Sequence, residues 1–203
     1  IGEYVVVDPV TGKQIADAYD RMVHAPDDPG VAAAYRALAE ETLDQYRFLV
    51  ERGATFTPWA GEGQPYQTSE DMVSDVSKGR RLYFFPTRSG FGVEGVEGEE
   101  VADSPLLAES GLTAVDSEGR TVPLLYNDLF RAVHDWFGHS KEGYAFGARG
   151  EENAWLEHRQ MYSPLAVSAL TTETRGQNSW VNFGKHLRRD DGSVPLRGEE
   201  GFV

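Results

Sequence analysis

Two histidines five residues apart are the strongest candidates for chemistry in this sequence. His134 and His139 open and close the run HDWFGH and are two of only five histidines in 203 residues. Imidazole is the commonest metal ligand in proteins. His134 recurs at helical spacing with Phe130 and Phe137 on a predicted helix that begins at Asn127, so it lies on the apolar, inward face. The sequence therefore predicts a buried metal ion with both histidines as ligands.

Gly138 decides whether the two imidazoles can meet. On a continuous α-helix, side chains five residues apart point about 140° away from each other. Glycine commonly ends helices. We therefore predict that the helix ends at Gly138 and that the chain folds back, which returns His139 to the side that carries His134.

A third ligand must come from another part of the chain. Two histidines and one carboxylate, with coordination positions left open, form the ligand set of non-haem Fe(II) oxygenases. Glu173 lies near the end of a predicted helix that begins at Ser163 and stops at Gly176, on a face shared with small residues such as Ala169. We predict Glu173 as the carboxylate ligand, and an ion pair with Arg175 is the alternative for this side chain.

Other polar side chains could belong to the same site. Glu151 and His158 are seven residues apart on a predicted helix over residues 151–162, so they share a face and could complete the site or hold a second metal. The alternative for His158 is a hydrogen-bonded core position. Asp135 could hold an imidazole N–H as an outer partner, and Gln177 could bind a substrate, although a surface position is the alternative for both.

The segment YNDLFRAVHDWFGHS resembles the iron-binding segment of the pterin-dependent aromatic amino acid hydroxylases. That family has an H-[DE]-x-x-G-H pattern and a later glutamate, to which TTETRG corresponds here. The resemblance covers about residues 126–176 and implies Fe(II) bound by His134, His139 and Glu173. Ser140 stands where the family usually has proline, and neither a pterin site nor the substrate-binding residues of that family can be placed in the N-terminal part.

Three functions are compatible with these residues. The first is a non-haem Fe(II) oxygenase or hydroxylase that brings O₂ and an unidentified small substrate to one metal. The second is a zinc- or manganese-dependent hydrolase with the same ligands and a metal-bound water as nucleophile. The third is a non-catalytic domain of a larger assembly or polyprotein, for which the polar residues 185–203, predicted as an extended tail, would be the connection onward.

Composition excludes several classes of protein. The chain has no cysteine, which removes disulfides, thiolate metal sites and cysteine nucleophiles. A net charge of −14 argues against nucleic-acid partners. The sequence has neither a secretory signal at its start nor an apolar run of the roughly 20 residues that would span a bilayer. We therefore expect a cytoplasmic protein with no membrane partner.

The remaining pattern predicts one mainly helical α+β domain over residues 1–203, with helices around the buried metal site and a few short strands or hairpins. Predicted helices beyond those named above cover residues 15–23, 29–52 and 69–78. Predicted strands cover residues 4–7 and 81–85, with a hairpin over residues 113–122. The Gly-rich acidic residues 89–100 are expected to form a surface loop that could cover the site.

Overall fold

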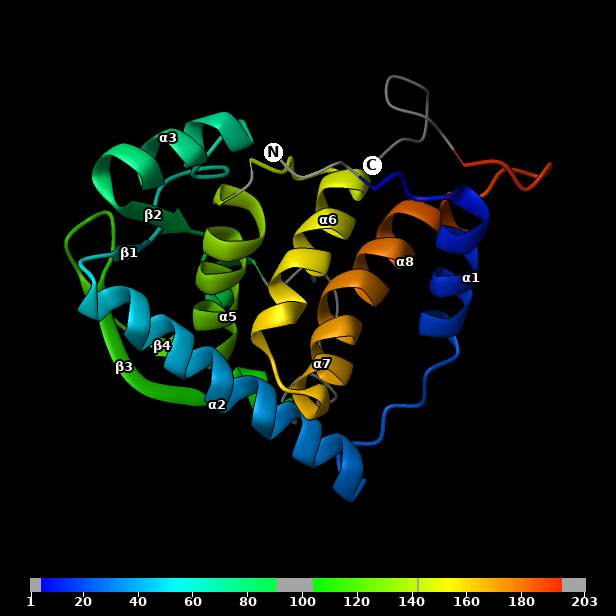
Figure 1. Ribbon diagram of the computed structural model, residues 1–203, viewed down its shortest axis with the longest axis horizontal. Coiled ribbons are helices and arrows are strands. Elements are labelled where there is room, and N and C mark those ends of the chain that lie inside the picture. The colour runs from blue at the N-terminus through cyan, green and yellow to red at the C-terminus, as the bar shows by residue number, and fades with distance from the viewer. Residues whose placement is uncertain (1–4, 91–103, 142, 195–203) are drawn as a thin grey trace.

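The computed structural model describes residues 5–90, 104–141 and 143–194. In these ranges the chain is mainly helical with two small sheets (Figure 1), which confirms the predicted mainly helical α+β class. The longer helices are α1 (Pro9–Asp20), α2 (Pro29–Glu51), α3 (Ser69–Gly79), α5 (Tyr126–His134), α6 (Ala148–His158), α7 (Pro164–Thr171) and α8 (Gln177–Phe183). Shorter segments are α4 (Thr87–Gly90), the π-helices η3 (Asp135–Ser140) and η5 (Thr172–Gly176), and the 3₁₀ turns η2 (Pro105–Leu107), η4 (Arg159–Met161) and η6 (Lys185–Leu187). The strands are β1 (Thr55–Pro58), β2 (Arg81–Phe84), β3 (Glu109–Val115) and β4 (Thr121–Leu125).

Two aspartates determine where the first two helices begin. Asp8 and Asp28 each accept hydrogen bonds from two backbone N–H groups of the following turn. Pro9 and Pro29 then occupy the first helical position, where no N–H donor is needed. The start predicted for α1 at Ile15 was too late, because the cap at Asp8 lets the helix begin before its apolar stripe does.

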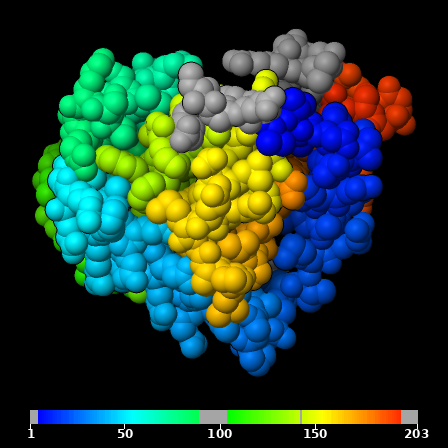
Figure 2. All heavy atoms as spheres, viewed as in Figure 1, coloured from blue at the N-terminus to red at the C-terminus, as the bar shows by residue number. Residues whose placement is uncertain are grey.

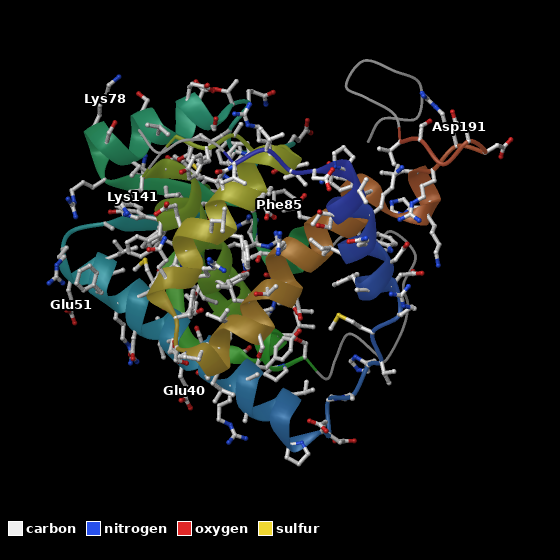
Figure 3. The ribbon with its side chains drawn as sticks, turned by 45° about the vertical axis from the view of Figure 1, so that its right-hand side comes forward. Glu40, Glu51, Lys78, Phe85, Lys141 and Asp191 are labelled. Atoms are coloured by element: carbon white, nitrogen blue, oxygen red, sulfur yellow. The ribbon has the colours of Figure 1, made fainter. Side chains whose placement is uncertain are left out.

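The long helix α2 crosses α6 and α7 diagonally (Figure 1). Its inward stripe follows helical spacing and consists of Ala34, Leu38, Ala39, Thr42, Gln45, Tyr46 and Leu49. On the opposite side, Glu40 and Glu51 point away from the other helices (Figure 3). The amide of Gln45 is therefore a polar group within a stripe that is otherwise mostly apolar.

Two pairs of strands lie on the side of the molecule that carries α3 and α5 (Figure 1). β1 and β2 are parallel and are joined through α3, and β3 and β4 form an antiparallel hairpin. The hairpin turn lies at Asp116–Gly119, where the Asp116 carboxylate accepts the backbone N–H groups of Glu118 and Arg120 at 2.9 Å. These pairs confirm the predicted hairpin and the predicted strand at residue 81.

The helix α5 lies between two apolar clusters. The first is built largely from β1, β2, α3 and α5 and includes Phe56, Met72, Leu82, Phe84, Leu129 and Val133. The second is built from α2, α5, α6 and α7 and includes Leu38, Phe130, Trp155, Ala166 and Leu170. α6 and α7 occupy the middle of one face of the molecule, between α2 and α1 (Figure 2). Packing on both sides therefore fixes the end of α5 that carries His134.

The predicted N-terminal strand, the Gly-rich loop and the polar tail all lie near the ends of the described ranges. Val5 exchanges two backbone hydrogen bonds with the Asn153 side chain, and residues 5–7 form no strand, so the strand predicted there is wrong. Most of the predicted loop at 89–100, and residues 195–203, lie outside the described residues. In the predicted tail, Lys185 forms an ion pair with Asp20 of α1 at 3.1 Å. Among the described helices, none combines the length and apolar character that a bilayer span requires.

Candidate metal centre

His134 is the last residue of α5 and is held in a nearly closed environment. Only 8% of the residue is exposed. Its ring stacks on Phe130 at a centroid distance of 5.9 Å, and Val133 beside it is fully buried. The apolar stripe of α5 thus aims the imidazole inward, as the helical spacing predicted.

The helix does not end at Gly138, so that prediction is wrong. α5 continues directly into the π-helix η3, whose hydrogen bonds run from residue i to residue i+5. The wider turn brings residues five apart to the same side, so His139 faces the same space as His134 without any chain reversal. A methyl group on Gly138 would approach Ala154 Cβ to 3.1 Å and the Ala154 carbonyl oxygen to 3.2 Å. The glycine therefore serves the close approach of α6 rather than the end of a helix.

Glu151, in the first turn of α6, supplies the carboxylate that faces both imidazoles. Its Oε2 lies 3.5 Å from His134 Nε2, and its Oε1 lies 3.4 Å from His139 Nε2. One ligand atom from each of the three residues falls within 4.8 Å of the others, an arrangement that could hold a metal ion. Both Nε2 atoms are buried, and neither has a hydrogen-bond partner. The carboxylate in this position was one of the sequence alternatives and not the first choice.

The separations between Glu151 and the two imidazoles are longer than those of charge-assisted hydrogen bonds. Charge-assisted N–H···O bonds between imidazolium and carboxylate are about 2.7–2.9 Å long. The observed 3.4 and 3.5 Å are longer than such bonds, in agreement with the absence of a hydrogen-bond partner at either Nε2 atom. The three residues could therefore hold a metal ion.

Hydrogen bonds on the far side of His139 determine its tautomer. Its Nδ1 lies 3.0 Å from the backbone oxygen of Tyr144. A carbonyl oxygen only accepts, so Nδ1 must carry the proton, and in the neutral ring the lone pair of Nε2 points toward Glu151. This outer carbonyl is the type of partner that orients metal-ligating histidines.

A longer chain of hydrogen bonds orients His134. The Gln45 Nε2 group donates to the Met161 carbonyl, which leaves Gln45 Oε1 to accept from His158 Nε2 at 2.8 Å. His158 Nδ1 then accepts from His134 Nδ1 at 3.2 Å. Burial, with the charges of His134 and His139, lowers the pKa of His158 well below its ordinary value, so this ring is neutral and carries a single proton. The lone pair of His134 Nε2 consequently faces Glu151 as well.

Electrostatics couple Glu151 to the histidines. Burial opposes both charged forms, yet the Glu151 carboxylate raises the pKa of His139 to about 9, and the nearby imidazoles lower the pKa of Glu151 to about 2. Burial also raises the pKa of Asp135, partly offset by His139 and His134. The site thus stabilises positive charge next to Glu151, whether it comes from protons or from a cation.

Glu173 lies elsewhere, so the ligand set predicted from the sequence needs correction. Its carboxylate accepts a hydrogen bond from the Tyr35 hydroxyl and lines a different pocket, which Gln177 also lines. The alternative, an ion pair of Glu173 with Arg175, is not formed either, because Arg175 pairs with Glu152 at 2.6 Å. Glu173 follows α7 in the π-helix η5, which runs on into α8 instead of stopping at Gly176, and this changes the direction of its side chain.

The outer partners also differ from the prediction. Tyr144 O and His158 hold the imidazole N–H groups for which Asp135 was the candidate. His158 is a hydrogen-bonded core residue and lies outside the three-residue group. Gln45 was not among the site residues predicted from the sequence. An amide within the apolar stripe of α2 was the signal that could have indicated its buried polar contact.

The fold and the site together define a mainly helical α+β protein with a candidate His₂Glu metal centre. No protein-family model matches the chain, and no curated protein or solved structure matches it at a significant level.

Proposed function

We propose that the chain is a mononuclear metal enzyme, a non-haem Fe(II) oxygenase or hydroxylase, with His134, His139 and Glu151 as its metal ligands. The observation that carries the proposal is the pair of buried, unpartnered Nε2 atoms that face opposite oxygens of one carboxylate. This ligand set differs from the one implied by the resemblance to the pterin-dependent hydroxylases. The proposal therefore includes neither pterin nor an aromatic amino acid substrate.

Three protein ligands leave coordination positions for other molecules, and Fe(II) in such a site can bring O₂ and a substrate together. The protein groups themselves would orient the ion and limit its access to water. His139 is fully buried, whereas 23% of the Glu151 side chain is exposed, so a small substrate would approach from the Glu151 side. Phe146, 41% exposed, lies beside His139 at a centroid distance of 5.3 Å and offers an apolar contact there.

A zinc- or manganese-dependent hydrolase is the second candidate, because two histidines and one glutamate are also a ligand set of catalytic zinc sites. Zinc with the same three ligands would lower the pKa of a bound water and so supply a nucleophile.

Metal content and O₂ uptake test the proposal. Protein purified without chelators should contain about one metal ion per chain, and His134→Ala, His139→Ala and Glu151→Gln should each lose it. Glu173→Ala is the matched control, because it removes a carboxylate of the sequence-predicted set, and it should retain the metal. Iron with substrate-dependent O₂ consumption supports the oxygenase, and zinc without it supports the hydrolase.

Two results would contradict a metal centre at this position. One is wild-type protein that binds neither Fe(II) nor Zn(II) in anaerobic titrations. The other is loss of metal through Glu173→Ala with retention in Glu151→Gln. Circular dichroism on each variant separates loss of ligand from loss of fold.

A further inference from the structure

A large pocket lies on another part of the molecule, between α1 with the loop that follows it, the first turns of α2, and the α7–η5 segment. Its volume is about 800 Å³, and it shares no residue with the candidate metal centre. Much of its wall is apolar, with contributions from Met22, Val23, Pro26, Val31 and Ala169. This volume falls in the range of pockets that bind small molecules.

Glu173 is the polar group that distinguishes this pocket. One carboxylate oxygen accepts a hydrogen bond from Tyr35. Among the described residues, no basic side chain forms an ion pair with Glu173, since the adjacent Arg175 is held by Glu152. Removing a carboxylate from water is unfavourable, and a cationic partner offsets that cost. A ligand could provide that partner.

The rings of two tyrosines accompany this carboxylate. Tyr19 lies against η5, where a methyl group on Gly176 would come within 2.8 Å of its ring, so the glycine allows this approach. The charge of Glu173 acts on both Tyr19 and Tyr35, which places the three side chains together. A carboxylate flanked by aromatic side chains is a favourable environment for an ammonium group that carries an apolar body.

The pocket lining contains neither lysine nor arginine, and His24 is its basic-type side chain. Asp28 also lines the pocket, and its Oδ1 caps α2 by accepting the N–H groups of Gly30 at 2.8 Å and Val31 at 3.0 Å. Glu173 differs from Asp28 because its carboxylate accepts a hydrogen bond from a tyrosine of the same lining.

We propose that this pocket binds a small organic amine, with its ammonium group on Glu173 beside Tyr19 and Tyr35 and its apolar body against the Met22–Val31 wall. The recognition would combine a charge-assisted hydrogen bond with apolar burial. Because the pocket is separate from the metal centre, this proposal does not depend on the proposed metal chemistry.

Isothermal titration with three matched probes tests the inference. The probes are 2-phenylethylamine, the uncharged 2-phenylethanol and the anionic 3-phenylpropionate, which differ chiefly in the charge of the head group. The amine should bind the wild-type protein, and Glu173→Gln should weaken it by about tenfold or more. Glu40→Gln removes the same charge from the exposed side of α2 and should leave binding unchanged (Figure 3).

The outcomes are distinct. Equal binding of the amine and the alcohol, equal affinities of wild type and Glu173→Gln, or no binding of the amine up to about 10 mM would each overturn the proposal. Loss of metal from His139→Ala with unchanged amine binding would show that the two sites are independent. Loss of amine binding in Glu173→Gln with unchanged metal content would also show that the pocket and the metal centre are independent.

Discussion

The Nδ1 atoms of His134 and His158 lie 3.2 Å apart, and this contact links the candidate metal centre to α2. His158 carries its single proton on Nε2, which donates a hydrogen bond to Gln45 Oε1 at 2.8 Å. Nδ1 of His158 is therefore free to accept. The amide of Gln45 is in turn oriented by the Met161 carbonyl. A chain of three side chains on three helices therefore sets which nitrogen of His134 is free to bind a metal.

Replacing His158 by leucine should weaken metal binding. Leucine has a similar volume but cannot accept the His134 proton, and loss of such an outer partner typically costs about 10–100-fold in metal affinity. Glutamine at the same position retains an acceptor and should restore part of the affinity. Competition titrations with a chromophoric chelator, on variants that circular dichroism shows to be folded, would measure both. Equal affinities for His158→Leu and His158→Gln would show that His158 acts only through packing.

Gly138 should tolerate no larger side chain. In Gly138→Ala the new methyl group would meet Ala154 Cβ at 3.1 Å and His134 Cε1 at 3.3 Å, so α6 or the imidazole must shift. Overpacking of this kind costs about 1–3 kcal/mol, against roughly 1 kcal/mol gained from the helix preference of alanine. We expect a net loss of stability together with weaker metal binding.

Gly79→Ala is the matched control, because Gly79 also lies in a helix but has only Arg81 Cβ within 4 Å, at 3.9 Å. This variant should unfold at the same or a higher urea concentration than the wild type and should keep its metal. A Gly138→Ala protein as stable as Gly79→Ala would mean that the close packing of η3 on α6 is not required.

The sequence was sufficient for the elements whose signals are local. Asp28 followed by proline marked the start of α2, and Ser163 followed by proline marked α7. The inward direction of the His134 side chain followed from helical spacing alone. These features depend on caps and periodicity, which act within a few residues.

The third ligand depends on tertiary packing, so the sequence could not select it. Glu151 and Glu173 both lie on predicted helices with inward faces. The π-helices η3 and η5 decide between them, because a π-turn changes the direction of every side chain that follows it. Glycine at position 138 was interpreted as a helix end, and nothing in one sequence separates that role from a close helix contact.

The ion pair of Glu152 with Arg175 should contribute strongly to stability. Their side chains are 9% and 28% exposed, the shortest contact is 2.6 Å, and the guanidinium also stacks on Trp155 at 4.5 Å. Removing one partner of a buried pair leaves the other charge uncompensated, at a cost of about 3–5 kcal/mol. We therefore expect Glu152→Ala to lower the free energy of unfolding by about 3 kcal/mol, measured by urea denaturation.

An exposed pair provides the comparison. Glu118 and Arg120 lie 3.1 Å apart, with side chains 55% and 62% exposed. Glu118→Ala should therefore change the unfolding free energy by no more than about 1 kcal/mol. Similar losses for the two variants would show that water screens the Glu152 pair far more than its burial indicates.

The carboxylate of Glu173 should make stability depend on pH. Burial raises its pKa above the ordinary value, and the hydrogen bond from Tyr35 offsets part of that rise. Tyr19 on α1 faces the same carboxylate, and its own pKa is raised by burial and by the charge of Glu173. His24 and Asp28 are the other titratable groups of the pocket lining. A raised folded-state pKa means that the folded protein binds this proton more tightly than the unfolded chain does.

The stabilisation from that proton is complete below the pKa of the unfolded chain and is lost as pH rises through the folded-state pKa. Near pH 7 the ionised Glu173 therefore destabilises the protein, and Glu173→Gln, which can still accept from Tyr35, should melt at a higher temperature than the wild type. The difference should shrink as the pH falls toward about 4, where glutamate itself becomes protonated. Thermal unfolding followed by circular dichroism at several pH values measures this trend. Glu40→Gln corrects for the general effect of removing one of many negative charges, and the same pH trend in both variants would contradict the assignment to Glu173.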